Sequence, residues 1–105
     1  MKYCFDLDGT LCNNTYGNYE TAVPFRDRIN YVNFLYKNGN IIFIESARGT
    51  TTNIDWLKFT EKQLNEWGLK YHTLRTGVKI DADFYIDDKG IKDTSFFIEK
   101  DNKYS

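Results

Sequence analysis

Two carboxylates stand one residue apart near the start of the chain, at Asp6 and Asp8, and Gly9 follows them directly. They come after the apolar run 3–5, which predicts a short buried strand. Ligands of open parallel sheets bind at the carboxyl ends of the strands, so we expect both carboxylates to face a site. A carboxylate there can serve as nucleophile, as general acid or base, or as ligand of a hard cation.

Three later strand-like runs also end in polar residues. The carboxyl ends of parallel strands meet at one edge of a sheet, so we expect these polar residues to converge on the first pair. The runs and the residues that follow them are 41–44 with Ser46, Ala47 and Arg48, 71–74 with Arg75 and Thr76, and 84–86 with Asp87 and Asp88.

Two helices are predicted between these strands. The first follows Pro24, carries apolar residues three and four apart (Phe25, Ile29, Val32 and Leu35), and ends at Asn38–Gly39. The second runs from about 54 to 67, with Thr52 and Asp55 as a capping box and Gly68 as its end. Its expected buried face consists of Leu57, Thr60, Leu64 and Trp67.

The alternation of strands and helices predicts an α/β fold with right-handed crossovers, a doubly wound and mostly parallel sheet in a single Rossmann-like domain, 1–105. Residues 11–21 read as a turn or short hairpin, which we call the flap. Residues 96–98 are expected to form an edge strand, and 99–105 a frayed tail. The spacings between the polar strand ends leave room for one helical crossover each and not for a cap domain.

Composition limits the function classes. The net charge is -1, which argues against a general nucleic-acid binder. No apolar run approaches the roughly 20 residues that span a bilayer, and the start of the chain leads into the acidic motif, so a cytoplasmic protein without membrane contact is expected. In a reducing compartment, Cys4 and Cys12 are expected to be free thiols.

Asp6-x-Asp8-Gly9-Thr10, then Ser46, Lys79 and Asp87–Asp88, resemble the four ordered motifs of the haloacid dehalogenase (HAD) superfamily. The resemblance covers residues 2 to about 92, and most members of that superfamily are phosphatases. The stretch 77–89 is similar in particular to small, cap-less members associated with capsular or cell-surface polysaccharide synthesis.

This resemblance implies a Mg²⁺-dependent phosphatase. Asp6 would be the nucleophile that forms an aspartyl-phosphate, and Asp8 the general acid and then base. Ser46 would donate a hydrogen bond to a phosphoryl oxygen, and Lys79 would neutralise the phosphate. Ile80 follows Lys79 where family members often have proline.

The resemblance also implies the ligands of the cation and of the substrate. Carboxylates as close as these repel one another, by about 3 kcal/mol at ~5 Å and an effective dielectric constant near 20, so a cation is needed among them. The expected Mg²⁺ ligands are Asp6, the Asp8 carbonyl, Asp87 and, directly or through water, Asp88. The expected substrate-binding residues are Gly9, Thr10, Ala47 and Arg48, although Arg48 could equally be an ion-pair partner.

The substrate is expected to be a phosphorylated small molecule. A sugar phosphate is favoured by the polysaccharide-type resemblance, and a nucleotide or polynucleotide 3′-phosphate is the alternative. From other classes, a receiver-like switch or a degenerate HAD binding module stays open, although receivers place these residues in a different order. A homo-oligomer could cover the open site through Tyr16 and Tyr19 of the flap or through Phe96–Phe97.

Overall fold

The computed structural model describes residues 1–49, 55–76, 84–87, 91–92 and 96–97. Its five strands form one sheet in the order β3-β2-β1-β4-β5, and every recorded strand pair is parallel. The elements are β1 (Lys2–Asp6), the 3-10 helix η1 (Tyr19–Thr21), α1 (Arg26–Lys37), β2 (Ile41–Ser46), α2 (Leu57–Glu66), β3 (Thr73–Thr76), β4 (Phe84–Asp87) and β5 (Ile91–Lys92).

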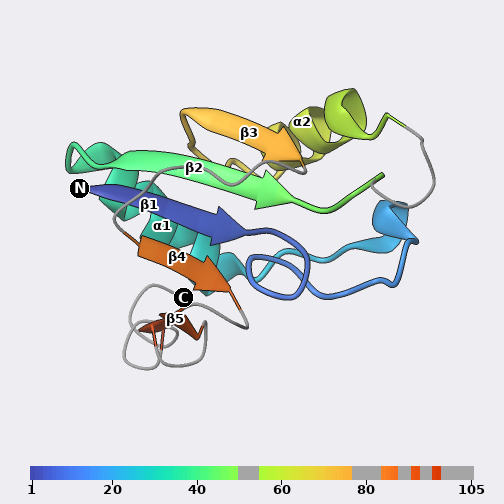
Figure 1. Ribbon diagram of the computed structural model, residues 1–105, viewed down its shortest axis with the longest axis horizontal. Helices are drawn as coiled ribbons and strands as arrows, with labels where there is room; N and C mark the ends of the chain where they lie inside the picture. Colours follow the sequence, from blue (N-terminus) through green and yellow to red (C-terminus); the bar gives the residue numbers. More distant parts are fainter. Residues whose placement is uncertain (50–54, 77–83, 88–90, 93–95, 98–105) are drawn as a thin grey trace.

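The strand order confirms the predicted α/β fold. The chain winds from β1 outward to β2 and β3 on one side and to β4 and β5 on the other, so β1 is the central strand (Figure 1). Strands and helices alternate from β1 to β3. Between Asp8 and Ser46, where every residue is described, the chain holds only η1 and α1 as helices, and therefore no cap domain.

The core lies against one face of the sheet, where α1, Leu64 of α2 and Phe97 contribute to a single cluster. Every second side chain of the strands points into this core. Those that are fully buried include Phe5, Ile42, Ile44 and Ile86. Helix α1 closes this core with Ile29, Val32 and Leu35. Burial of these large side chains is the main favourable term in folding a chain of this length.

The predicted end of α1 is confirmed. Asn38 is the C-cap, and Gly39 has φ 87°, a left-handed conformation that glycine adopts without cost from a side chain. The Asn40 N–H then donates to the Leu35 carbonyl at 3.2 Å, which satisfies a carbonyl of the last turn.

The start of α2 differs from the prediction. The helix begins at Leu57, so Asp55 precedes it, and the Asp55 carboxylate accepts a hydrogen bond from the Leu57 N–H at 3.0 Å. Asp55 therefore bonds the first backbone donor of the helix from outside, as a cap does. It does not occupy the inner position of a capping box. Thr52 lies outside the described residues.

Two further assignments needed correction. The strand expected at 71–74 is β3 at Thr73–Thr76, two residues later, because its register is set by pairing with β2 from Phe43 onward. Phe96 and Phe97 are helical, and the edge strand is β5 instead.

The phenylalanine pair faces the core. Phe97 is fully buried, and its ring contacts those of Phe5 at 6.2 Å and Tyr31 at 6.4 Å. Aromatic rings in these contacts add to core packing. The flap residue Tyr19 also packs within the chain, against Trp56 at 5.0 Å, whereas Tyr16 is 91% exposed. Of the surfaces expected to serve a homo-oligomer, only Tyr16 is largely open to solvent.

Both cysteines are free thiols, as predicted. Within the part of the chain that the structure describes, no helix has the length and apolar character needed to cross a membrane.

Two isoleucines of β2 test the position of the core. Ile44 is fully buried and Ile41 is 36% exposed. We expect Ile44→Ala to lower the free energy of unfolding by about 2–5 kcal/mol, because it leaves a cavity under the sheet. The matched control Ile41→Ala should cost less than about 1 kcal/mol. Urea denaturation measures both, and equal costs would contradict the core as described.

Candidate active site

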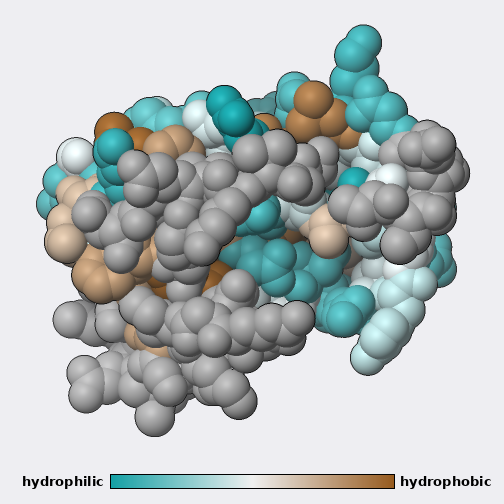
Figure 2. Space-filling view, in the orientation of Figure 1, coloured by the Kyte–Doolittle hydropathy of each residue, from teal (hydrophilic) through white to brown (hydrophobic). Residues whose placement is uncertain are grey.

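The carboxyl edge of the three central strands brings predicted site residues together. Asp6 ends β1 and pairs with Glu45 of β2, so Ser46 follows one residue further on the neighbouring strand. Phe5 pairs with Ile86, which places the β4 residue Asp87 beside Asp6. Neighbouring strands are about 4.8 Å apart, so these three positions adjoin. The surface around the strand ends is mainly hydrophilic (Figure 2).

The loop after β1 is wound around a single carbonyl. The Leu7 carbonyl accepts hydrogen bonds from the N–H groups of Thr10, Leu11 and Cys12, at 3.1, 2.9 and 3.3 Å. Gly9, with φ 87°, supplies the left-handed turn that this winding needs. Leu7 and Leu11 are fully buried, so the loop is anchored on both sides of the turn and Asp8 is held at the sheet edge.

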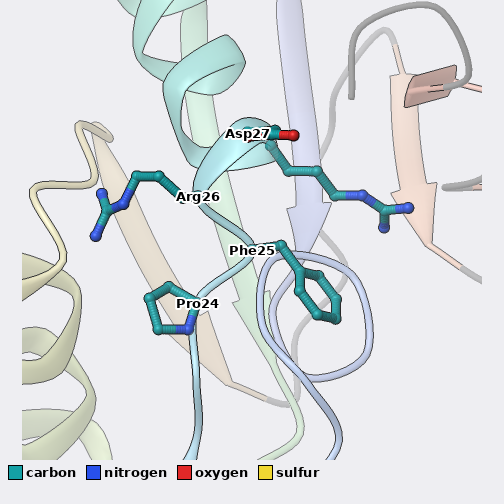
Figure 3. A pocket seen from close by; sticks show the side chains of 5 residues that line it. Pro24, Phe25, Arg26 and Asp27 are labelled. Atoms are coloured by element: carbon teal, nitrogen blue, oxygen red, sulfur yellow. The ribbon is translucent and has the colours of Figure 1, made fainter. Parts of the chain in front are cut away.

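Arg28 of α1 also contacts this loop. Arg28 donates from Nη1 to the Thr10 carbonyl at 3.0 Å, and its guanidinium lies over the rings of Phe25 and Phe97 at 5.4 and 4.8 Å. A hollow of about 390 Å³ is lined here by residues 24–28 (Figure 3). Thr10, a predicted substrate-binding residue, is buried. We therefore interpret the hydrogen bond from Arg28 to its carbonyl as a contact that stabilises the loop.

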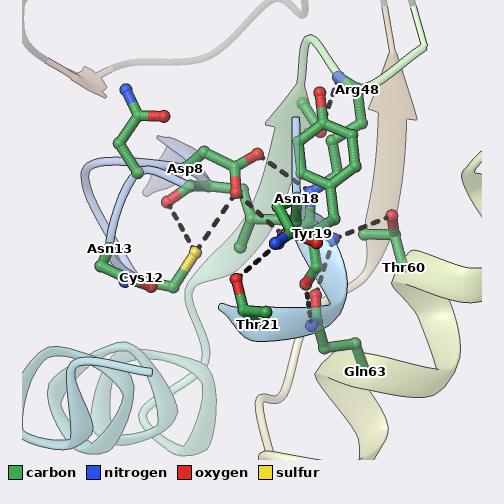
Figure 4. Close-up of polar contacts among 12 residues, drawn as sticks. Asp8, Cys12, Asn13, Asn18, Tyr19, Thr21, Arg48, Thr60 and Gln63 are labelled. Atoms are coloured by element: carbon green, nitrogen blue, oxygen red, sulfur yellow. Dashed lines mark hydrogen bonds and ion pairs between the residues drawn. The ribbon is translucent and has the colours of Figure 1, made fainter. Parts of the chain in front are cut away.

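Arg48 and Asp8 form a bidentate ion pair. Arg48 Nε donates to Asp8 Oδ2 and Nη2 donates to Asp8 Oδ1, each at 2.9 Å (Figure 4). The Arg48 side chain is 0% exposed and that of Asp8 is 19% exposed. The expectation left Arg48 open between a substrate ligand and an ion-pair partner, and in this structure it is an ion-pair partner, buried rather than at the surface.

Three residues that were not predicted as part of the site complete the surroundings of Arg48. Its Nη1 donates to Thr60 Oγ1 at 3.3 Å and to Gln63 Oε1 at 2.6 Å, and its guanidinium lies 4.5 Å from the centre of the Tyr19 ring. Gln63 Nε2 donates in turn to the Tyr19 carbonyl at 2.9 Å. The Arg48 side chain thus connects the loop after β1, α2 and the flap (Figure 4).

One signal in the sequence pointed to these residues. Thr60 was expected on the buried face of α2, and Gln63 lies three residues further on the same face. Polar residues on a buried face require partners, and here the partner is Arg48. Leu57, also expected on that face, is 37% exposed, so the buried face is rotated toward Gln63.

Ser46 adjoins the same group. It is 1% exposed, and its Oγ accepts a hydrogen bond from the Arg48 N–H at 3.1 Å. The hydroxyl keeps its own proton for donation, which is what an oxygen of a bound phosphoryl group requires. The next residue, Ala47, is exposed beside it.

Cys12 lies against Asp8 but is a poor nucleophile. Its thiol contacts Asp8 Oδ1 at 3.5 Å, and burial, followed by the nearby Asp8 carboxylate, raises the pKa of the thiol to about 12. A thiol with this pKa stays protonated at neutral pH and is therefore a poor nucleophile. The described aspartates of this edge, Asp6 and Asp8, carry oxygen donors, which suit Mg²⁺.

The residues expected to hold Mg²⁺ are only partly described. Asp6 and Asp8 are described, and Asp87 is placed by its position in β4. Among the described side chains, no group of three His, Cys, Asp or Glu is arranged as a metal site. Lys79 and Asp88 lie outside the described residues, so their roles stay predictions.

The fold is similar to that of known structures. A protein from Vibrio cholerae, an MCSG target with a crystal structure, aligns with a TM-score of 0.73 and 27% identity over 99% of this chain and 96% of its own. A chain of the Pnkp1/Rnl/Hen1 RNA repair complex aligns with a TM-score of 0.63 and 16% identity, over 95% of this chain and 40% of its own. A chain from another structure of the Pnkp1/Rnl/Hen1 complex aligns with a TM-score of 0.57 and 22% identity, over 94% of this chain and 34% of its own.

The present chain therefore spans less than half of either RNA repair chain. No protein-family model matches the sequence, and no curated protein matches it. The structural comparisons show a small α/β fold shared with part of those larger chains.

Proposed function

We propose that this chain is a Mg²⁺-dependent phosphomonoester hydrolase of the HAD type. The observation that carries the proposal is the meeting of Asp6, Asp8 and Ser46 at the carboxyl edge of the central strands, with the Asp8 carboxylate held in one orientation. Phosphoryl transfer needs a nucleophile in line with the leaving group, an acid for the departing oxygen and compensation of the negative charge.

The proposed reaction has two steps. The Asp6 carboxylate attacks phosphorus, the bond from phosphorus to the leaving oxygen breaks, and that oxygen takes the proton of Asp8. The Asp8 carboxylate then removes a proton from a water molecule, whose oxygen attacks the phosphorus of the aspartyl-phosphate. The bond from phosphorus to the Asp6 oxygen breaks, inorganic phosphate leaves, Asp6 is again a carboxylate and Asp8 is again protonated.

The surrounding residues hold the transferred group. Ser46 donates its hydroxyl proton to a phosphoryl oxygen, and Lys79 supplies a positive charge. Asp6, the Asp8 carbonyl and Asp87 are the oxygen ligands proposed for Mg²⁺, and Asp88 is proposed to bind it directly or through water. When bound, Mg²⁺ offsets the charge on the phosphoryl oxygens and the repulsion among the carboxylates.

A sugar phosphate is the substrate class that we favour, and a polynucleotide 3′-phosphate is the second candidate. The second is supported by the fold similarity to chains of an RNA repair complex. The absence of a cap between Asp8 and Ser46 leaves room for either substrate. Tyr16, at 91% exposure on the flap, is a surface that a large substrate or a second copy of the chain could cover.

Asp6→Asn tests the nucleophile. The amide keeps the shape of the side chain but cannot form the acyl-phosphate, so we expect kcat on a nitrophenyl phosphate with Mg²⁺ to fall by at least about a thousandfold. The control Glu66→Gln makes the same chemical change at the end of α2 and should leave kcat unaltered. Asp6→Asn activity within tenfold of the starting protein would contradict the assignment.

Removal of Mg²⁺ tests the metal ligands. A ligand that binds only the native state, at about a hundredfold its dissociation constant, stabilises that state by about 2.7 kcal/mol. We therefore expect Mg²⁺ to raise the melting temperature relative to EDTA at matched ionic strength, and Asp87→Ala to abolish most of the rise. Glu66→Ala serves as the control and should keep it. Identical melting curves of the unmutated protein in Mg²⁺ and EDTA would refute the proposed metal site.

A further inference from the structure

Arg48 and Gln63 belong to one continuous chain of hydrogen bonds that ends at the proposed acid. The Gln63 carboxamide holds the flap with its nitrogen, at the Tyr19 carbonyl, and holds Arg48 with its oxygen. Arg48 then forks onto both oxygens of Asp8. Figure 4 shows the side chains of Gln63 and Arg48 pointing toward each other from α2 and from the loop after β2.

Burial makes this arrangement fixed rather than incidental. As whole residues, Arg48 is 2% exposed and Gln63 is 8% exposed. Burying a polar group costs free energy unless its donors form hydrogen bonds. The four bonds from the guanidinium, to Asp8, Thr60 and Gln63, supply that compensation. In a low-dielectric environment, each of these bonds is also stronger than in water. Rotation of Arg48 toward a substrate would break them together.

The bidentate ion pair with Arg48 fixes the orientation of the Asp8 carboxylate. Two parallel N–H···O bonds fix the plane of a carboxylate. Asp8 Oδ1 accepts from Arg48 Nη2 and from the Cys12 thiol, whereas Oδ2 accepts, among the described residues, only from Arg48 Nε. An ionised carboxylate oxygen has two lone pairs, so Oδ2 keeps one for a proton. Asp8 is also the partner with solvent access, at 19% exposure against 0% for Arg48.

We infer that Arg48 and Gln63 are positioning residues: Arg48 orients the Asp8 carboxylate for proton transfer, and Gln63 holds Arg48 in place and ties it to the flap. The part that concerns proton transfer rests on the proposed function of Asp8. The inference differs from the sequence-based expectation of a substrate contact, because Arg48 acts here through Asp8 and not on the phosphate.

Two substrates with different leaving groups test this role. Nitrophenolate departs without a proton, whereas the alkoxide of glycerol phosphate needs one. We expect Arg48→Met to lower kcat for glycerol phosphate by about tenfold more than for nitrophenyl phosphate, as Asp8→Asn does more strongly, with KM changed less than about twofold. Arg48→Lys should not restore the ratio, because an ammonium cannot fork onto both oxygens.

The control and the contrary results are defined in the same assay. Arg26 also donates from a guanidinium, to the Trp67 carbonyl at 2.6 Å, but at an exposed position, so Arg26→Met should leave the ratio unchanged. A rise of KM on both substrates with kcat intact would show that Arg48 binds the phosphate, and equal losses of kcat would show a merely structural role. Either result, or full rescue by lysine, overturns the inference.

A double-mutant cycle tests whether Gln63 acts on Asp8 through Arg48. Gln63→Leu keeps the volume of the side chain but removes both of its hydrogen bonds. We therefore expect kcat for glycerol phosphate to fall about threefold more than kcat for nitrophenyl phosphate. If Gln63 acts through Arg48, the double variant should lose no more than Arg48→Met alone. Losses that multiply would mean that Gln63 acts independently and would overturn its part of the inference.

Hydrogen exchange of the flap gives a result that needs no turnover. Gln63→Leu removes the hydrogen bond from Gln63 to the Tyr19 carbonyl, and Arg48→Met removes the bond that holds Gln63. Both variants should speed amide exchange in residues 13–21 of the flap by about fivefold or more, whereas Arg26→Met should not. Unchanged exchange overturns the link to the flap. If the unmutated protein hydrolyses neither ester, the proposed function fails, and exchange alone decides whether the link exists. If Arg48→Met does not fold, Arg48→Lys and Gln63→Leu carry both measurements.

Discussion

The candidate site depends on the burial of one positive charge. Arg48 has left water almost completely, and a guanidinium can do so only where a carboxylate and further acceptors meet it with good geometry. Asp8 provides the charge, and Thr60 and Gln63 provide the remaining acceptors. Because these partners come from the loop after β1 and from α2, the ion pair fixes the distance between two otherwise separate parts of the chain. We therefore expect a change in the position of α2 to alter the orientation of the Asp8 carboxylate.

The sheet supplies the second constraint. The central strand β1 ends at Asp6, and its parallel neighbours β4 and β2 bring Asp87 level with Asp6 and Ser46 one residue further along. A chain of 105 residues has little core with which to hold such an edge rigid. Aromatic residues compensate: Phe5 and Phe97 fill the space under the strands with large buried rings. The rigidity of the strand ends thus rests on packing well away from the polar groups.

Local patterns predicted the elements, and pairing between elements adjusted their limits. Helix α1 ends where Asn38–Gly39 predicts, because a left-handed C-cap is a local property of the backbone. The start of α2 and the position of β3 were misplaced by a few residues, because hydrogen bonds to groups outside each pattern decide them. Phe96–Phe97 read as a strand from its composition, yet it is helical, since burial against Phe5 and Tyr31 outweighs strand propensity.

The sequence by itself located the ends of β1 and β2, and therefore predicted that Asp6, Asp8 and Ser46 would share one edge of a parallel sheet. The period of apolar residues is enough for that, because parallel strands align their carboxyl ends. Only the tertiary structure decided what Arg48 does. Its partner Asp8 is 40 residues away and Gln63 is 15 residues away, and no local pattern relates them. Their meeting depends on the rotation and depth at which α2 packs against the sheet, which is set by side-chain packing throughout the core.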